Sequence, residues 1–129
     1  MLYQPVTEMI IGAYYKVYNY LGYGFLEKVY ENAMVLELVE QGFKVAQQQS
    51  ITVYYRGTVV GDYLADLMVN DKIIIELKAA ESLKDPHVAQ LMNYLKATDK
   101  EVGLLLNFGK KPEFRRVVCS KGPHLPDSP

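Results

Sequence analysis

The stretch that decides the fold lies in the middle of the chain and reads YLADLMVNDKIIIELK, residues 63–78. It contains two apolar runs, residues 63–69 and 72–78, which are joined around Asn70 and Asp71. Asn and Asp are residues that turns favour. Both runs are apolar at successive positions, which is typical of strands that are covered on both faces. The stretch therefore predicts a hairpin of two central strands.

Three charged side chains interrupt this apolar hairpin. Asp66 lies in the first strand, and Glu76 and Lys78 lie two residues apart in the second, so these last two point to the same face. Burying a charge is costly unless it is paired or bound to a metal. A structural Glu–Lys pair would explain the second strand alone. The added aspartate favours an oxygen-rich site for Mg²⁺ or Mn²⁺.

Such a site would perform phosphodiester chemistry. The metal would orient the phosphodiester and acidify a water, while the lysine would stabilise charge or help to deprotonate that water. The strand register tests this interpretation. A two-residue loop of Asn70 and Asp71 would place Asp66 and Glu76 on opposite faces of the sheet. The metal site therefore predicts an odd loop, a β-bulge or a sharp bend in the strand of Asp66.

Helices and further strands are expected around the hairpin. Pro5 and an apolar spacing of three and four predict a helix that ends near Gly22 or Gly24, and a second helix is expected over residues 26–41. The other expected segments are a stretch rich in β formers at 43–49 and 51–55, a turn at 56–57 that leads to a strand at 59–60, a helix at 87–98, a strand at 102–108 and an edge strand at 114–118. The order is two helices, four strands, a helix and one or two strands. It predicts an α/β or α+β fold, with a mixed central β-sheet flanked by α-helices.

Composition limits the classes of function. The chain has 129 residues, 15 Asp and Glu against 14 Lys and Arg, and a net charge of −1. One domain is expected over residues 1–120, with a disordered tail at 121–129. The near-neutral charge argues against a protein held to nucleic acid by bulk attraction. A single cysteine, Cys119, indicates a reducing, cytoplasmic location, and no apolar run predicts a membrane partner.

Three short motifs occur in order along the chain. They are Gly24-Phe-Leu-Glu27-Lys-Val-Tyr30, then Asp66 with Glu76-Leu77-Lys78, and Gln90-Leu-Met-Asn-Tyr94. The ordered set resembles the GxxExxY proteins, a bacterial and archaeal group within the PD-(D/E)XK nuclease superfamily, and the resemblance extends from about Val6 to Val118. Ala65 stands where the superfamily name has proline, a departure that is ordinary in its exonuclease-like branch.

The resemblance implies a restriction-endonuclease-like core with a Mg²⁺ or Mn²⁺ cofactor. It implies that the metal is held by the carboxylates of Glu27, Asp66 and Glu76 and by the backbone carbonyl of Leu77. The same comparison implies that Lys78 is the catalytic lysine. The implied reaction is hydrolysis of phosphodiester bonds in nucleic acid, DNA in preference to RNA. A non-catalytic module that binds nucleic acid or protein, and a small-molecule phosphohydrolase, are the alternatives.

The helical motif residues have two interpretations each. By the resemblance, Gln90 and Tyr94 line the cleft and contact the scissile phosphate or its water. Gln90 would otherwise be a buried amide and Tyr94 a core residue, while Glu27 would be a first-turn acid favoured by the helix dipole. Gly24 fits a helix cap. If three carboxylates lie within about 5 Å of one another, their repulsion raises the pKa of one of them.

Basic residues gather after the last buried strand. They would form a rim that contacts phosphates, or a solvated turn and edge strand protected by charge. Tyrosines crowd the first helix, where Tyr14 and Tyr18 are expected in the core. Exposed tyrosines would suit base stacking or a homodimer. The basic residues are Lys110, Lys111, Arg115, Arg116 and Lys121.

Overall fold

The computed structural model describes residues 3–121 and contains three helices and five strands within them. The expected tail, apart from Lys121, lies outside the described residues. Within the described part of the chain, no helix is long and apolar enough to cross a membrane. The elements are α1 (Gln4–Leu21), α2 (Glu27–Glu40), β1 (Val45–Tyr55), β2 (Thr58–Val69), β3 (Ile73–Lys78), α3 (Asp85–Lys96), β4 (Val102–Phe108) and β5 (Pro112–Val118).

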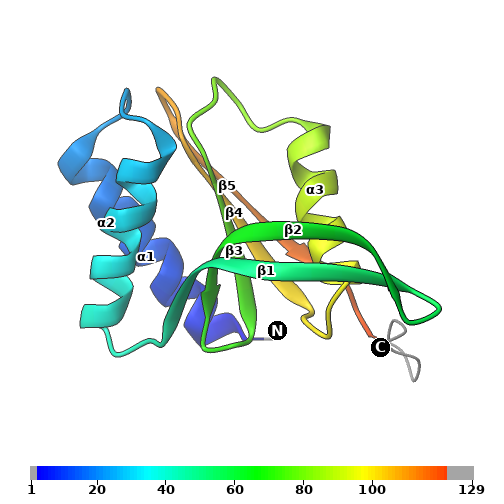
Figure 1. Ribbon diagram of the computed structural model, residues 1–129. Helices are drawn as coiled ribbons and strands as arrows, with labels where there is room; N and C mark the ends of the chain where they lie inside the picture. The colour runs from blue at the N-terminus through cyan, green and yellow to red at the C-terminus, as the bar shows by residue number, and fades with distance from the viewer. Residues whose placement is uncertain (1–2, 122–129) are drawn as a thin grey trace.

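The five strands form one mixed sheet in the order β1-β2-β3-β4-β5. β3 and β4 run parallel through the α3 crossover, and the other neighbouring pairs are antiparallel. Figure 1 shows α1 and α2 on one side of the sheet and α3 on the other. This arrangement confirms the expected fold class, a mixed sheet flanked by helices.

The continuous apolar runs are explained by two cores, one on each face of the sheet. Ile73 and Ile75 of β3 pack into the core beneath α1 and α2, whereas Ile74 between them packs into the core beneath α3. Successive strand residues point to opposite faces, so both must be apolar when both faces are covered. All three isoleucines are fully buried. The central position of this strand is therefore confirmed.

Helix α1 is held to the sheet by its tyrosines. Tyr14 is fully buried, its ring lies 5.0 Å from Phe108, and its hydroxyl donates to the backbone carbonyl of Asn107. Tyr18 donates from its hydroxyl to the carbonyl of Gly109 at 2.7 Å. The expected core role of both tyrosines is confirmed. The helix ends as expected at Gly22, which takes a left-handed φ of 67°.

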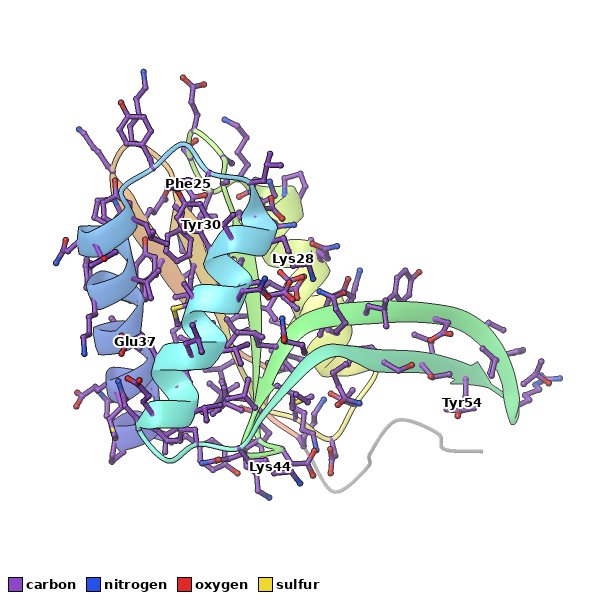
Figure 2. All side chains as sticks on the ribbon, turned by 60° about the vertical axis from the view of Figure 1, so that its left-hand side comes forward. Phe25, Lys28, Tyr30, Glu37, Lys44 and Tyr54 are labelled. Carbon is purple, nitrogen blue, oxygen red and sulfur yellow. The ribbon has the colours of Figure 1, made fainter. Side chains whose placement is uncertain are left out.

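The strands β1 and β2 are longer than expected. Residues 43–49 and 51–55 are rich in β formers on either side of Ser50, and Val45–Tyr55 is one continuous strand, as is Thr58–Val69. In the sequence, the polar Ser50 interrupts the pattern of β-forming residues. It pairs with Leu64 across the hairpin, and an antiparallel partner satisfies the backbone whatever the side chain is. Figure 2 shows the resulting long hairpin extending away from α1 and α2, with Tyr54 near its tip.

The loop between β2 and β3 contains three residues. Val69 pairs with Ile73, so residues 70–72 form the connection, and the expected odd loop is confirmed. Asn70 and Asp71 adopt left-handed φ angles of 53° and 54°, which these residue types tolerate better than most. Antiparallel pairing ends at Leu67 and Ile75. One step beyond that pair, the register places Asp66 directly opposite Glu76.

Candidate active site

The strands β2 and β3 separate at Asp66 and Glu76. Here hydrogen bonds between main chain and side chains replace those between the two backbones. The Asp66 N–H donates to Oε2 of Glu76 at 2.6 Å, and the Leu77 N–H donates to Oδ2 of Asp66 at 2.8 Å. We call Asp66, Glu76 and Leu77 the β2–β3 fork. Each carboxylate of the fork is held by a main-chain N–H of the opposite strand. Both acids are therefore fixed in place by the sheet.

Burial makes the fork electrostatically costly. Glu76 is only 3% exposed. Burial, followed by the charge of Asp66, raises the pKa of Glu76 to about 8. Burial also raises the pKa of Asp66 above its usual range. The expected raised pKa is confirmed in direction, but desolvation is a larger cause than repulsion between carboxylates. Without a bound metal ion, the raised pKa of Glu76 favours its protonated form at neutral pH.

A chain of hydrogen bonds connects β3 to α3 beside the fork. Nζ of Lys78 donates to Oε1 of Gln90 at 3.1 Å, and Nε2 of Gln90 donates to the hydroxyl of Tyr94 at 3.1 Å. The Lys78 charge lowers the pKa of both Asp66 and Glu76, opposing their burial. The structure therefore brings together six of the predicted site residues, namely Asp66, Glu76, Leu77, Lys78, Gln90 and Tyr94. Tyr94 is 5% exposed and packs in the core beneath α3, so its core role is confirmed, and a contact with substrate stays a prediction.

Glu27 does not complete a compact carboxylate cluster. It is exposed at the first residue of α2, where the helix dipole also favours an acid. Its charge raises the pKa of Asp66 and Glu76, so it lies within electrostatic range of the fork. Among residues 3–121, however, no three acidic, His or Cys side chains converge closely enough to hold a metal. The expectation of three carboxylates within about 5 Å is therefore wrong for this structure.

A second helical acid, Glu31, was missed in the sequence. It is 4% exposed and lies one turn after Glu27 on α2. Its Oε2 accepts from Nζ of Lys28 at 2.9 Å and from Nε2 of Gln47 at 2.8 Å. Glu31 contributes more than Glu27 to the raised pKa of Asp66. Glu31 lies four residues after Glu27 and so on the same face of the helix, and this spacing is the sequence signal for Glu31 as a second acid near the site.

Gln48 connects this second acid to the fork. Its Nε2 donates to Oε1 of Glu31 at 2.8 Å and lies 3.5 Å from Oδ1 of Asp66. Gln48 adopts a left-handed φ of 52° within β1, opposite Asp66. Such a backbone conformation is unfavourable for a residue other than glycine and is often found at functional sites. The distortion allows an amide from β1 to reach both acids.

The tyrosine of the GxxExxY motif has a structural role. The Tyr30 hydroxyl donates to the carbonyl of Gly22 at 2.6 Å and accepts from the N–H of Phe25 at 3.1 Å. Its ring stacks on Phe108 at 4.1 Å. Figure 2 shows Tyr30 and Phe25 close together at the start of α2. Tyr30 therefore fixes the loop from which α2 and Glu27 begin. Gly24 has a φ of 109° in this loop and does not cap a helix, which corrects that expectation.

Removing the Tyr30 hydroxyl is expected to loosen this loop. Tyr30→Phe should lower the free energy of unfolding by about 1 kcal/mol, because the Gly22 carbonyl and the Phe25 N–H, both in part-buried hydrogen bonds, lose their partner. Urea unfolding followed by circular dichroism measures the change. Tyr20→Phe is the matched control, since Tyr20 is 90% exposed. Equal stability of the two variants would contradict a structural role for the hydroxyl.

Asn107 holds the chain just after Lys78. Its side chain is fully buried; Oδ1 accepts from the N–H of Ala80 and Nδ2 donates to the Ala80 carbonyl, both at 2.9 Å. Gly109 lies close to the same segment, where an added Cβ would come within 2.3 Å of the Ala80 carbonyl oxygen. An asparagine within the apolar run of residues 102–108 is the sequence signal for this contact.

The basic residues near the C-terminus do not form one surface. Lys110 is exposed and, with Glu27, lines a cavity of about 560 Å³. Lys111 is exposed in the same β4–β5 turn. Arg115 and Arg116 are successive residues of β5, so they point to opposite faces of the sheet. Lys121 donates to the carbonyl of Leu95 at 2.5 Å. Of the residues predicted to form a basic rim, Lys110 and Lys111 lie together in the β4–β5 turn.

Known proteins resemble this chain in sequence and in fold. The sequence model of the PD-(D/E)XK nuclease superfamily matches residues 4–117. Among solved structures, the crystal structure of SSO0001 superposes with a TM-score of 0.55 at 19% sequence identity, over 70% of this chain and 48% of SSO0001. The matched part is thus about half of SSO0001, and the likeness concerns the fold alone. Among curated proteins no sequence match was found.

Proposed function

The chain belongs to the PD-(D/E)XK nuclease superfamily, and we propose that it is a metal-dependent nuclease that hydrolyses phosphodiester bonds of nucleic acid, DNA in preference to RNA. The observation that carries the proposal is the β2–β3 fork, where the buried carboxylate of Glu76 meets the half-buried carboxylate of Asp66, with Lys78 two residues beyond. The Gly24, Glu27 and Tyr30 motif supports assignment to the GxxExxY group.

The fork suits Mg²⁺ or Mn²⁺. The two fork acids, whose pKa values are raised, are poorly compensated by Lys78 alone, so a divalent cation would stabilise their charged forms. Asp66, Glu76 and the Leu77 carbonyl would hold the ion, and Glu27 remains the candidate for a further ligand. Mg²⁺ usually binds one or two carboxylates and completes its shell with water and phosphate oxygens. Bound there, the metal would polarise the phosphate and acidify a water.

Lys78 would act on the same phosphate. An ammonium group has three N–H donors, and Gln90 accepts one of them. Its positive charge would stabilise the negative charge that develops during phosphodiester cleavage. Gln90 would orient Lys78 and is itself held by the Tyr94 hydroxyl. Gln90 and Tyr94 would then be positioning residues that also border the path of the substrate.

A cleavage assay tests the proposal. The purified protein is incubated with Mg²⁺ or Mn²⁺ and with supercoiled, linear and single-stranded DNA and with RNA. We expect metal-dependent cleavage that Asp66→Asn abolishes. Asp62→Asn is the matched control, because Asp62 lies on the same strand, is exposed and accepts from Ser50 at 3.2 Å. If no substrate is cut, or if Asp66→Asn cuts equally, the nuclease proposal fails. Binding without cleavage would favour the non-catalytic module.

A further inference from the structure

A cavity of about 560 Å³ lies between the β1–β2 hairpin and α3. We call it the hairpin cavity. Its volume is within the range of pockets that bind small ligands, roughly 300–1,000 Å³. The hydrolysis proposed above uses none of its hairpin residues. The lining residues used below are Ile51 and Tyr63 from the hairpin and Gln90, Asn93, Tyr94 and Lys96 from α3.

The hairpin cavity adjoins the candidate active site. Gln90 and Tyr94 line the cavity and also form the hydrogen-bond chain that ends on Lys78. The charge of Glu76 contributes to the raised pKa of Tyr94, so the fork and the cavity are within electrostatic range. A strand whose phosphate lies at Lys78 would therefore have a neighbouring nucleotide at the mouth of the cavity.

The walls of the cavity suit a flat aromatic ring. Tyr63 is 51% exposed, and its ring lies 5.9 Å from that of Tyr94 at an angle of 39°. Ile51 provides a buried apolar surface, and the amides of Gln90 and Asn93 supply donors and acceptors. Aromatic side chains that stack on bases, combined with nearby polar groups, are the usual means of holding unpaired nucleotides.

The charge of the lining also suits nucleic acid. Among the described residues that line the cavity, Lys96 is the charged one, and none is acidic. A polyanionic strand would therefore meet no repulsion there, in contrast to the carboxylates of the fork. Such a lining favours a nucleotide over a cationic or basic peptide segment.

We propose that the hairpin cavity binds an unpaired nucleobase next to the phosphodiester that is cut, with Tyr63 as its stacking platform. The inference rests on the proposed function, because it takes the substrate strand to lie along Lys78. A base inside a duplex is paired and stacked on its neighbours, so it must leave the helix to enter the cavity. The preferred substrate is then single-stranded, or frayed at the point of cleavage.

The test uses binding of a fluorescent single-stranded DNA oligonucleotide, measured by anisotropy in an Asp66→Asn background, which is expected not to cleave it and which keeps Lys78 and Gln90 in place. Tyr63→Ala should weaken binding by roughly 5- to 150-fold, the range expected when one stacked base is lost. Tyr63→Phe keeps the ring and should bind as the parent does. A duplex of the same sequence should bind more weakly than the single strand and should be insensitive to Tyr63→Ala.

Oligonucleotides with one abasic position locate the base. At a single position, removal of the base should weaken binding as much as Tyr63→Ala does, and the two changes together should add little. Independent effects at every position would overturn the proposal. So would unchanged binding by Tyr63→Ala or equal binding of the duplex.

A fluorescent base analogue tests the wild-type fold directly. 2-Aminopurine placed at successive positions should be quenched at one position when wild-type protein binds. Uniform fluorescence at all positions would overturn the inference, whatever the stability of the variants. The two proposals fail separately. Metal-dependent cleavage with no base-dependent step would remove the cavity proposal alone, whereas base-dependent binding without cleavage would remove the nuclease proposal alone.

Discussion

Lys78→Ala is expected to lower the rate of phosphodiester cleavage by about 10²–10⁴-fold, the range for loss of a positioned acid–base group. Lys78 donates to Gln90 at 3.1 Å, and its charge opposes the raised pKa values of both fork acids. Removing it takes the positive charge from the site and leaves the amide of Gln90 without its donor. The rate should fall even when Mn²⁺ is saturating.

Cleavage of radiolabelled DNA under single-turnover conditions measures this effect. Lys72→Ala is the matched control, because Lys72 is an exposed lysine of the same hairpin at the opposite end of β3. Lys78→Arg separates two roles: arginine keeps the charge but does not release a proton. Partial activity in Lys78→Arg would indicate charge stabilisation, and none would indicate proton transfer. Undiminished cleavage by Lys78→Ala would point to a contaminating nuclease.

The metal-free protein is expected to lose stability as the pH rises from about 4.5 to about 8. In this window the folded state keeps the Glu76 proton that the unfolded chain has released, so raising the pH favours unfolding. The stabilisation is fully present below the unfolded pKa and is lost as the pH passes the folded value. A shift of this size corresponds to at most about 5 kcal/mol. Glu76→Gln should flatten the dependence.

Mn²⁺ should reverse the loss. At about pH 8, millimolar Mn²⁺ is expected to raise the melting temperature, because it binds the folded fork and not the unfolded chain. The rise should shrink toward about pH 5, where the metal must displace a proton. Differential scanning fluorimetry measures both trends. Asp66→Asn should remove the rise and Asp62→Asn should keep it. Identical melting curves with and without Mn²⁺ for all three proteins would exclude a metal site at the fork.

The parts of the fold that follow from local pattern could be predicted from the sequence. The isoleucines of β3 indicate a strand covered on both faces, and Asn70 with Asp71 marks the turn. Requiring Asp66 and Glu76 to share a face correctly excluded a regular two-residue hairpin. A periodic sequence pattern does not predict the length of a strand when pairing with a partner strand keeps it continuous. The continuity of β1 through Ser50 depends on pairing with β2, which no local window contains.

The site was predictable on the strands and less so on the helices. Glu76 and Lys78 follow from strand alternation, whereas the burial of Glu31 and the exposure of Glu27 depend on how α2 meets the distorted backbone at Gln48. Propensity does not anticipate a left-handed glutamine in a strand. Closeness in sequence was equally misleading at Arg115 and Arg116, because neighbouring strand residues face opposite ways.

The three-residue turn at 70–72 has a consequence for how the gene tolerates change. Loss of a single codon from this turn would shift the pairing of β2 against β3 by one residue. Asp66 would then face away from Glu76, and the apolar side chains of one strand would exchange cores. No site residue would have been altered, yet the carboxylate pair would be gone. The length of this turn is therefore as necessary for the carboxylate pair as the identity of the two acids.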